Sequence, residues 1–574
     1  MPLEFPKVGL ALSGGGFRAA AFHLGVLKRL EELGVLPSVS VLSVVSGGAI
    51  VGALYAARCE EVGGRAGSYP VDKLIAELRP FLMRNLRGRA FFGTPWRTAR
   101  TVLSFAIPGV QRAPLFESAL ESLFAGRTMS DVPSWLVINA TNLRTGKAWK
   151  FTQDLMGDYV VGACESGRHV QLAQAVAASA AFPGLVDALS LRTQWSELDP
   201  ARLRPPMWPV LSQEQRADAD RWRQRHGESR ERRARLSGAL VPNHRAAIMP
   251  LVDGGIYDND GLVSLRAACV THAIVSSSAT PGNDYRGGLP FVRELVRVAG
   301  VMHARLGGAN RSLCWESTHA AHPETVAARL EELAMALSAL SVVDAPPNAV
   351  QGIIDELRDL AAVGRPPRGW QYTSSAQIVL HRHDVVRDAF ARLATNPLSI
   401  PLEDRGVEAS ILDELSRIRT DLDAFSAETI DLLIGQGYVM ADAYVKVTMP
   451  ELLPAAPTAP RSASAQPCLS AIKRANADVK GWQTRLRAEG KRRLPVGRCG
   501  TWGERWRIWA GFVGGLTVLA ALVGGILLIG AIAARGAASS RIVRELRALP
   551  FVQRLPAPIT AAGAPRTRVL ANEP

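Results

Sequence analysis

Near its amino terminus the chain reads Val8-Gly-Leu-Ala-Leu-Ser-Gly-Gly-Gly-Phe-Arg18, and a second passage of similar design, Val39-Ser-Val-Leu-Ser-Val-Val-Ser-Gly-Gly48, follows it. Each passage begins with a short apolar run, typical of a buried strand, and continues through a glycine turn into a helical pattern. The first turn offers bare backbone N–H groups at the start of a helix, and the second places Ser46 on a sharp strand-to-helix turn. A nucleophile beside such donors is the minimal apparatus for acyl transfer.

Composition narrows the class of partner. The chain has 574 residues, which allows two or more domains or one large α/β domain with insertions. Its formal charge of +15 suits an anionic partner, either nucleic acid or an acidic lipid surface. Much of the positive excess lies near the carboxyl terminus, and the sequence has no RNA-binding motif or zinc-finger spacing. We therefore expect a lipid surface and no nucleic acid.

The cysteines indicate a reducing compartment. They are scattered and form no CxxC pair, which is typical of free thiols rather than of a disulfide framework or a zinc site. Their positions are Cys59, Cys164, Cys269, Cys314, Cys468 and Cys499. The first residues are charged and run directly into the first strand, so we expect no signal peptide and a cytoplasmic catalytic domain.

One segment is a candidate for a single membrane span. Residues 508–534 carry no charge over 27 positions, which is long enough to cross a bilayer with some tilt. Trp506 and Trp509 lie at its start, where aromatic side chains meet the membrane interface. Gly511 and Gly515 form a GxxxG pair, a pattern that can pack two such helices into a homodimer but that also arises often by chance in an apolar segment of this length.

The order of the other patterns predicts the organisation of the chain. Strand and helix alternate from residue 8 to 60, and further strands are expected at 249–252 and 272–278, so we predict an α/β fold with a mostly parallel sheet flanked by helices. Residues 72–130 and 291–444 are largely helical in pattern, with a strand candidate at 377–380. The domains expected are a catalytic domain over 1–447 with an arginine-rich insertion at about 190–247, a linker and basic juxtamembrane segment over 448–507, the span over 508–534, and a basic disordered tail over 535–574.

A nucleotide site is the first alternative for the glycine turn, because Gly14 to Ala19 also fit a relaxed GxGxxA fingerprint. That fingerprint needs an acidic residue near the end of the second strand to hold the ribose. No Asp or Glu occurs between Val35 and Ile50, and the Ser46 turn occupies that place. A phosphate loop has even less support than the dinucleotide site, because no Gly-Lys-Ser/Thr follows the glycines.

A serine nucleophile needs a base, and Asp253 is the best candidate. It ends a predicted strand and opens Asp253-Gly-Gly255, which presents its side chain at the end of a sheet. None of the ten histidines lies in a comparable turn. A carboxylate can serve as the base if it lies within hydrogen-bond reach of the hydroxyl.

Together these motifs resemble the patatin-like phospholipase family. Its G-G-G-x-R loop, G-x-S-x-G serine and D-G-[GA] aspartate correspond here to Gly14-Gly-Gly-Phe-Arg18, Val44-Val-Ser-Gly-Gly48 and Asp253-Gly-Gly255. Ala178-Ser-Ala-Ala-Phe-Pro183 is similar to the family's serine-alanine-proline block, and Asn139-Ala-Thr-Asn-Leu-Arg-Thr-Gly146 to the strand-turn before it. The resemblance covers roughly residues 5–445.

The resemblance implies a Ser-Asp dyad without histidine and without a metal or cofactor. Ser46 would attack an ester carbonyl and Asp253 would take its proton. Gly14, Gly15 and Gly16 would line an oxyanion hole, and Arg18 would steady that loop or form a surface salt bridge. The sequence departs from the family where Val44 replaces the first elbow glycine, and where the insertion precedes Asp253.

We therefore predict a membrane-anchored serine hydrolase of phospholipids or other acyl-ester lipids. An acyltransferase or thioesterase could use the same dyad, and a catalytically inactive lipid-binding scaffold is an alternative from another class. The abundance of Ala, Arg and Gly indicates a bacterial genome rich in G and C.

Overall fold

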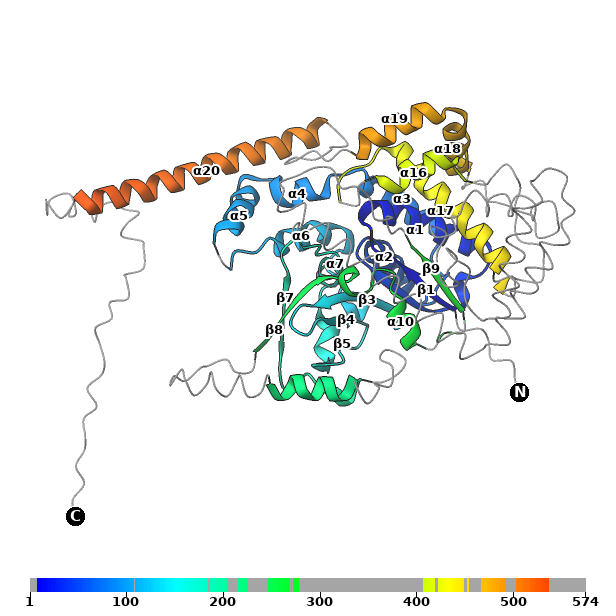
Figure 1. The fold of residues 1–574 in the computed structure, drawn as a ribbon, viewed down its shortest axis with the longest axis horizontal. Coiled ribbons are helices and arrows are strands. Elements are labelled where there is room, and N and C mark those ends of the chain that lie inside the picture. The colour runs from blue at the N-terminus through cyan, green and yellow to red at the C-terminus, as the bar shows by residue number, and fades with distance from the viewer. Residues whose placement is uncertain are drawn as a thin grey trace, which may run out of the picture.

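The structure is a computed structural model of the whole chain (Figure 1). The residues that it describes are 8–107, 109–183, 186–203, 215–225, 246–268, 270, 272–277, 406–418, 422–448, 452–453, 466–490 and 502–535.

Four parallel strands form the centre of a nine-stranded sheet. They are β1 (Val8–Leu12), β2 (Val39–Val45), β3 (Leu136–Asn142) and β9 (His272–Ser276), in the order β3-β2-β1-β9. β1 is buried along its whole length, which explains why it is an apolar run and not an alternating one. This arrangement confirms the predicted α/β fold and the predicted strands at both glycine turns.

The remaining strands add an antiparallel edge. β4 (Lys147–Phe151), β5 (Met156–Asp158) and β6 (Gly162–Cys164) follow β3 as a meander. β7 (Leu189–Gln194) pairs with β8 (Ala246–Asp253), and β8 also pairs with the last residues of β3. The sheet is therefore mixed, with its parallel part at the centre.

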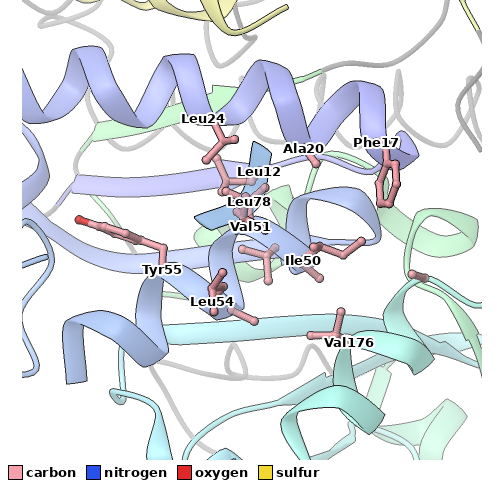
Figure 2. Packing of buried hydrophobic residues seen from close by; sticks show 14 of the residues in the cluster. Leu12, Phe17, Ala20, Leu24, Ile50, Val51, Leu54, Tyr55, Leu78 and Val176 are labelled. Atoms are coloured by element: carbon pink, nitrogen blue, oxygen red, sulfur yellow. The ribbon is translucent and has the colours of Figure 1, made fainter. Parts of the chain in front are cut away.

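Helices α1 (Gly16–Glu32) and α2 (Gly47–Glu61) follow the two glycine turns and pack against the sheet. Their buried faces meet α3 (Val71–Leu82) and α7 (Leu172–Ser179) in one hydrophobic core. Figure 2 shows this core, in which Leu24 and Ala20 of α1 and Leu54 of α2 lie among the labelled buried side chains. Burying each large aliphatic side chain stabilises the fold by about 1.5–3 kcal/mol.

The long helix α17 (Ala427–Thr448) lies against α1, and glycines make the contact close. A Cβ at Gly25 would lie 1.8 Å from the Ile434 carbonyl oxygen, and one at Gly437 would lie 2.1 Å from that of Phe22. Buried ion pairing adds to the contact, because the Arg29 guanidinium lies 2.7 Å from Asp442. The carboxyl-terminal part of the chain thus belongs to the same core as its first helix.

The other helices surround these layers (Figure 1). They are α4 (Leu86–Phe92), α5 (Pro95–Ala106), α6 (Ala113–Phe124), α9 (Gly255–Asp258), α10 (Leu262–Ala267), α16 (Ala409–Arg417), α18 (Gln466–Ala477), α19 (Val479–Gly490), α20 (Trp502–Arg535) and a helix over residues 215–225.

Two predicted boundaries differ from the structure. The predicted linker over 448–507 contains α18 and α19, which bury Leu469, Ile472 and Trp482 against α16 and α17. The prediction of a linker is wrong there. The few apolar residues of this segment recur at helical spacing, so the segment forms amphipathic helices. The predicted insertion over 190–247 includes β7 and the start of β8, which are part of the sheet. The strand candidate at 377–380 and the predicted tail beyond residue 535 lie outside the described residues.

The predicted span is the single long helix α20, and its first turns rest on the domain. The Asn85 N–H, at the start of α4, donates to the Glu504 carboxylate at 3.2 Å, and the Phe92 and Phe512 rings meet edge to face at 5.6 Å. A Cβ at Gly511 would lie 2.2 Å from the Phe92 carbonyl oxygen, and one at Gly515 would lie 2.3 Å from the Thr98 Cβ. The GxxxG pair therefore packs on α4 and α5 of the same chain, and a homodimer through this helix stays a prediction.

Candidate active site

Ser46 lies on a strained turn between β2 and α2. Its φ of 52° and ψ of −116° fall in a region that non-glycine residues rarely adopt. The turn is tight because Gly47 and Gly48 pass against other backbone: a Cβ at Gly47 would lie 2.2 Å from the Gly16 carbonyl oxygen. The sharp turn predicted at this serine is confirmed.

Val44, where the family pattern has glycine, is accommodated by a glycine elsewhere. Its side chain is fully buried, and a Cβ at Gly52, in the second turn of α2, would lie 2.3 Å from the Val44 Cγ1 atom. The space that the elbow requires thus comes from α2. The contact between Gly52 and Val44 depends on how α2 packs against β2, so the sequence pattern of the elbow could not predict that a glycine in α2 makes room for the valine.

A hydrogen-bond relay holds the turn from behind. The Ser46 N–H donates to the Ser179 hydroxyl at 2.9 Å, and that hydroxyl donates to the Asn139 carbonyl oxygen at 2.6 Å. Asn139 also donates through its side chain to the Val44 carbonyl oxygen at 3.1 Å. Ser179 and Asn139 lie in the two secondary motifs of the sequence, but their positioning role was not predicted, because it depends on how α7 meets β3.

The register of β3 brings Asp253 to Ser46. Val45, the last residue of β2, pairs with Asn139 of β3, and the next residue of β3, Ala140, pairs with Asp253 of β8. β8 therefore continues the sheet where β2 leaves it, and its last residue lies beside the turn that follows β2. Two residues 207 positions apart are adjacent for this reason.

The two side chains are in direct contact. The Ser46 hydroxyl donates to the Asp253 Oδ2 atom at 2.8 Å, and the Gly255 N–H donates to Oδ1 at 2.8 Å. Both residues are buried, with 8% and 5% of their surfaces exposed. Burial raises the pKa of Asp253 to about 6, although the bonds from Gly255 and Ser46 favour the ionised form and lower it in part.

The glycine loop faces this pair. A Cβ at Gly14 would lie 3.2 Å from that of Ser46, and Gly15 and Gly16 have positive φ angles of 139° and 59°, which only glycine adopts readily. The Gly14 N–H donates to the Asn259 carbonyl oxygen at 3.0 Å. Gly14 thus anchors the loop, while Gly15 and Gly16 begin α1 beside the nucleophile.

Arg18 is buried, with only 2% of its surface exposed. Its guanidinium donates to the Ile418 carbonyl oxygen at 3.3 Å, and burial lowers the pKa of Arg18 to about 10. It ties the first turn of α1 to the segment after α16. This position agrees with a role in steadying the glycine loop from the side of the core.

The described residues contain no cluster of three or more His, Cys, Asp or Glu side chains that could hold a metal ion. Their histidines include His23, which is buried in α1 and contacts the Ser276 hydroxyl at 2.7 Å. Burial lowers the pKa of His23 to about 4, so this imidazole is a neutral part of the core. It bonds the ends of β1 and β9, not the dyad.

Comparison with known families agrees with this geometry. The model of the patatin-like phospholipase family matches residues 10–265, a range that includes the glycine loop, Ser46 and Asp253. Residues 10–265 are a patatin-like phospholipase domain. The elements that complete its core, α16 to α19, lie beyond the matched range.

Two solved structures of human GIVD cytosolic phospholipase A2 are similar to part of this chain. The complex with methyl γ-linolenyl fluorophosphonate is 22% identical over 30% of this chain and 29% of that enzyme, with a TM-score of 0.24. The other structure is 20% identical over 31% of this chain and 28% of the enzyme, with the same TM-score of 0.24. The chain thus spans under a third of either enzyme, too little to transfer a substrate. The curated proteins contain no match.

Proposed function

We propose that this chain hydrolyses the acyl esters of lipids, with Ser46 as the nucleophile and Asp253 as its base. The observation that carries the proposal is the 2.8 Å hydrogen bond from the Ser46 hydroxyl to the Asp253 carboxylate. The patatin-like phospholipase domain gives the reaction class, and the dyad gives it a mechanism.

In the first step the Ser46 oxygen attacks the ester carbonyl carbon while its proton passes to Asp253. A carboxylate with a pKa near 6 is a stronger base than an ordinary one, yet it is still mostly ionised at neutral pH. The Gly255 N–H holds the other carboxylate oxygen, which keeps Oδ2 directed at the serine. When the tetrahedral intermediate collapses, the alcohol leaves with that proton and the acyl group stays on Ser46.

The negative charge on the carbonyl oxygen is stabilised by the glycine loop. Gly15 and Gly16 are the donors we assign, because they open α1 beside Ser46, whereas the Gly14 N–H is engaged with Asn259. Loss of one such donor typically slows acyl transfer by a factor of about 100 or more. Water then attacks the acyl-enzyme, again with Asp253 as base, which releases the fatty acid and restores the dyad.

We infer that the lipid substrate lies in a bilayer, because α20 could anchor the domain in a membrane. It is the single helix among the described residues that is long and apolar enough to cross a membrane, with a mean hydropathy of 1.8 over its candidate window. Only 22% of that window is buried inside the protein, which does not fit a core helix. The free thiols of Cys59, Cys164 and Cys468 favour the reducing, cytoplasmic side for the domain.

The test uses the full chain in lipid nanodiscs, assayed on a soluble short-chain ester and on a phospholipid. Ser46→Ala should reduce both activities by a factor of about 1,000 or more. Ser122→Ala and Asp154→Asn are matched controls on exposed side chains, and they should keep full activity. Mass spectrometry of the wild-type protein should show the acyl group on the peptide that contains Ser46.

The alternatives give other results. Equal activity in wild type and Ser46→Ala would overturn the dyad. Inactivity of the wild type on every ester would indicate a lipid-binding scaffold. Release of product only when an acyl acceptor is added would indicate a transferase.

A further inference from the structure

We propose that α5 is a second membrane-contacting element, which lies in the headgroup region of the bilayer that α20 enters. The inference rests on the proposed function only in taking α20 as a span. Its occupant is a phospholipid bilayer, and the surface concerned, here called the α5 face, consists of Trp96, Val102, Phe105 and Ile107.

Exposed and buried side chains both occur along α5. Thr98, Ala99 and Thr101 are packed on the protein, with 0%, 1% and 4% of their surfaces exposed. On the α5 face, by contrast, Trp96 is 66% exposed and Phe105 is 73% exposed. Large aromatic side chains rarely lie that free in water on one helix, so this face indicates an apolar partner.

The glycines of α20 hold α5 against the span. Gly511 lies on the Phe92 carbonyl oxygen, just before α5, and Gly515 lies on Thr98, in its first turns. The contact with the later glycine of α20 is made by the later residue of the α4–α5 segment, so α20 and α5 run in the same general direction where they touch. The close approach that GxxxG pairs give to two membrane helices is used here to fasten a short helix to a long one.

The length of α20 sets the depth of this contact. Among the residues of α20 whose burial is described, up to Gly525, the last buried one is Gly515. About 20 residues follow it to Arg535, a length of about 30 Å, which is the thickness of a hydrocarbon core. Leu516 and Leu522, at the start of that part, are 42% and 51% exposed. Since α5 lies beside this end, its face is at the membrane boundary.

The flanking residues favour lipid over a second protein. Trp502, Trp506 and Trp509 are exposed on the part of α20 that precedes Gly515, and Arg505 and Arg507 lie between them, so aromatic and cationic side chains surround the helix where it approaches the bilayer. On the α5 side, the Arg112 guanidinium lies over the Phe105 ring at 4.5 Å, which keeps a cation next to an apolar side chain. Arg112 also pairs with Asp187, so the α5 face is joined to the loop that follows the Ser179 block.

The test places a photoreactive benzoylphenylalanine at position 105 of the full chain, in vesicles of phosphatidylcholine and phosphatidylglycerol. After illumination we expect adducts between residue 105 and lipid. The matched control is the same probe at Leu143, which is 54% exposed in the turn between β3 and β4 and should give no lipid adduct. A crosslinked dimer at residue 105, or no adduct at all, would overturn the proposal.

A second measurement separates this proposal from the catalytic one. The double variant Trp96→Ser with Phe105→Ser should lower hydrolysis of vesicle phospholipid by about tenfold, because it loses burial of two aromatic side chains in the interface. Its activity on a soluble short-chain ester should be unchanged, as should both activities of Leu143→Ser. If the wild type lacked all esterase activity, the proposed Ser-Asp mechanism would be wrong, but lipid adducts at residue 105 would still show whether α5 contacts the bilayer. Unchanged hydrolysis of vesicle phospholipid by the double variant would contradict the proposal for the α5 face.

Discussion

Ser46 and Asp253 each carry a cost that a purely structural residue would not. The φ of 52° at Ser46 costs about 1–3 kcal/mol in strain, and the buried carboxylate of Asp253 is ionised without a cationic partner among the contacts that shift its pKa. The relay through Ser179 holds the first residue, and the Gly255 N–H supports the second. Backbone strain and a buried unpaired carboxylate are typical of active sites, where the arrangement of the reacting groups matters more than stability.

The base should give the reaction its pH dependence. Because burial raises the pKa of Asp253 to about 6, kcat/KM for an uncharged soluble ester should fall as the pH drops through about 6 and level off above it. A rate profile from pH 4.5 to 8.5 measures this. A profile that is flat across this range would show that Asp253 is not the base.

Replacing Asp253 by Asn should stabilise the fold while it abolishes catalysis. A carboxyl whose folded pKa is raised to about 6 favours the native state when protonated, and this stabilisation is lost as the pH rises through 6. At pH 7.5 the ionised side chain then costs about 3 kcal/mol, which Asn avoids. Thermal unfolding should show a higher Tm for Asp253→Asn at pH 7.5 and no gain at pH 4, with exposed Asp154→Asn unchanged at both.

Replacing Ser179 should lower kcat and leave substrate binding unchanged. Ser179→Ala removes the acceptor of the Ser46 N–H, so the elbow loses its rear support while both dyad side chains remain. We expect kcat to fall by about tenfold to a hundredfold with little change in KM, as in the loss of one positioning bond of about 1.5–3 kcal/mol. An equal rise in KM with kcat unchanged would assign Ser179 to substrate binding.

At the scale of elements, β3 assembles the site because its two halves pair with different strands. Its first half pairs with β2 and its second with β8, so the ends of those strands meet. The glycine loop and α1 complete the arrangement, and α17 fixes α1 from outside.

The contact between α1 and α17 gives a prediction. Gly25→Ala places a methyl group 1.8 Å from the Ile434 carbonyl oxygen, so the helices must separate, which should cost about 1–3 kcal/mol. Thermal unfolding of the full chain in detergent measures the loss. Gly503→Ala, with nothing within 4 Å, should leave the Tm unchanged, and an equal Tm for both variants would contradict the packing.

The elements show what sequence alone could give. The strands, the turn at Ser46 and the pairing of Ser46 with Asp253 as candidates followed from local patterns and family motifs. Gly52 making room for Val44, and Gly511 contacting Phe92, could not be predicted, because they depend on which surfaces meet. The helices α18 and α19 were missed since their composition, rich in Arg and Ala, is typical of solvated segments.

At the scale of the whole molecule, α20 is the element that we propose places the domain at a membrane. Val518→Arg with Leu522→Arg places two charges on positions that are 41% and 51% exposed, so the domain should fold normally. Each Arg near the centre of a span costs about 2.5–3.5 kcal/mol, and the chain should move from the carbonate-resistant membrane fraction to the soluble one. The control variant Leu143→Arg, whose substitution lies on the domain surface, should stay in the membrane fraction. If the double variant also stayed in the membrane fraction, the proposal that α20 spans the membrane would be contradicted.

The split pairing of β3 also affects the order of synthesis. Ser46, the proposed nucleophile, leaves the ribosome early, but Asp253, its proposed base, lies on β8, which cannot join the sheet until residue 253 has been made. A nascent chain that ends before β8 therefore carries a serine without a proton acceptor. The helix α20 is translated later still, about 250 residues after β8, so on the proposed function both side chains of the dyad are synthesised well before the segment that we assign to the bilayer.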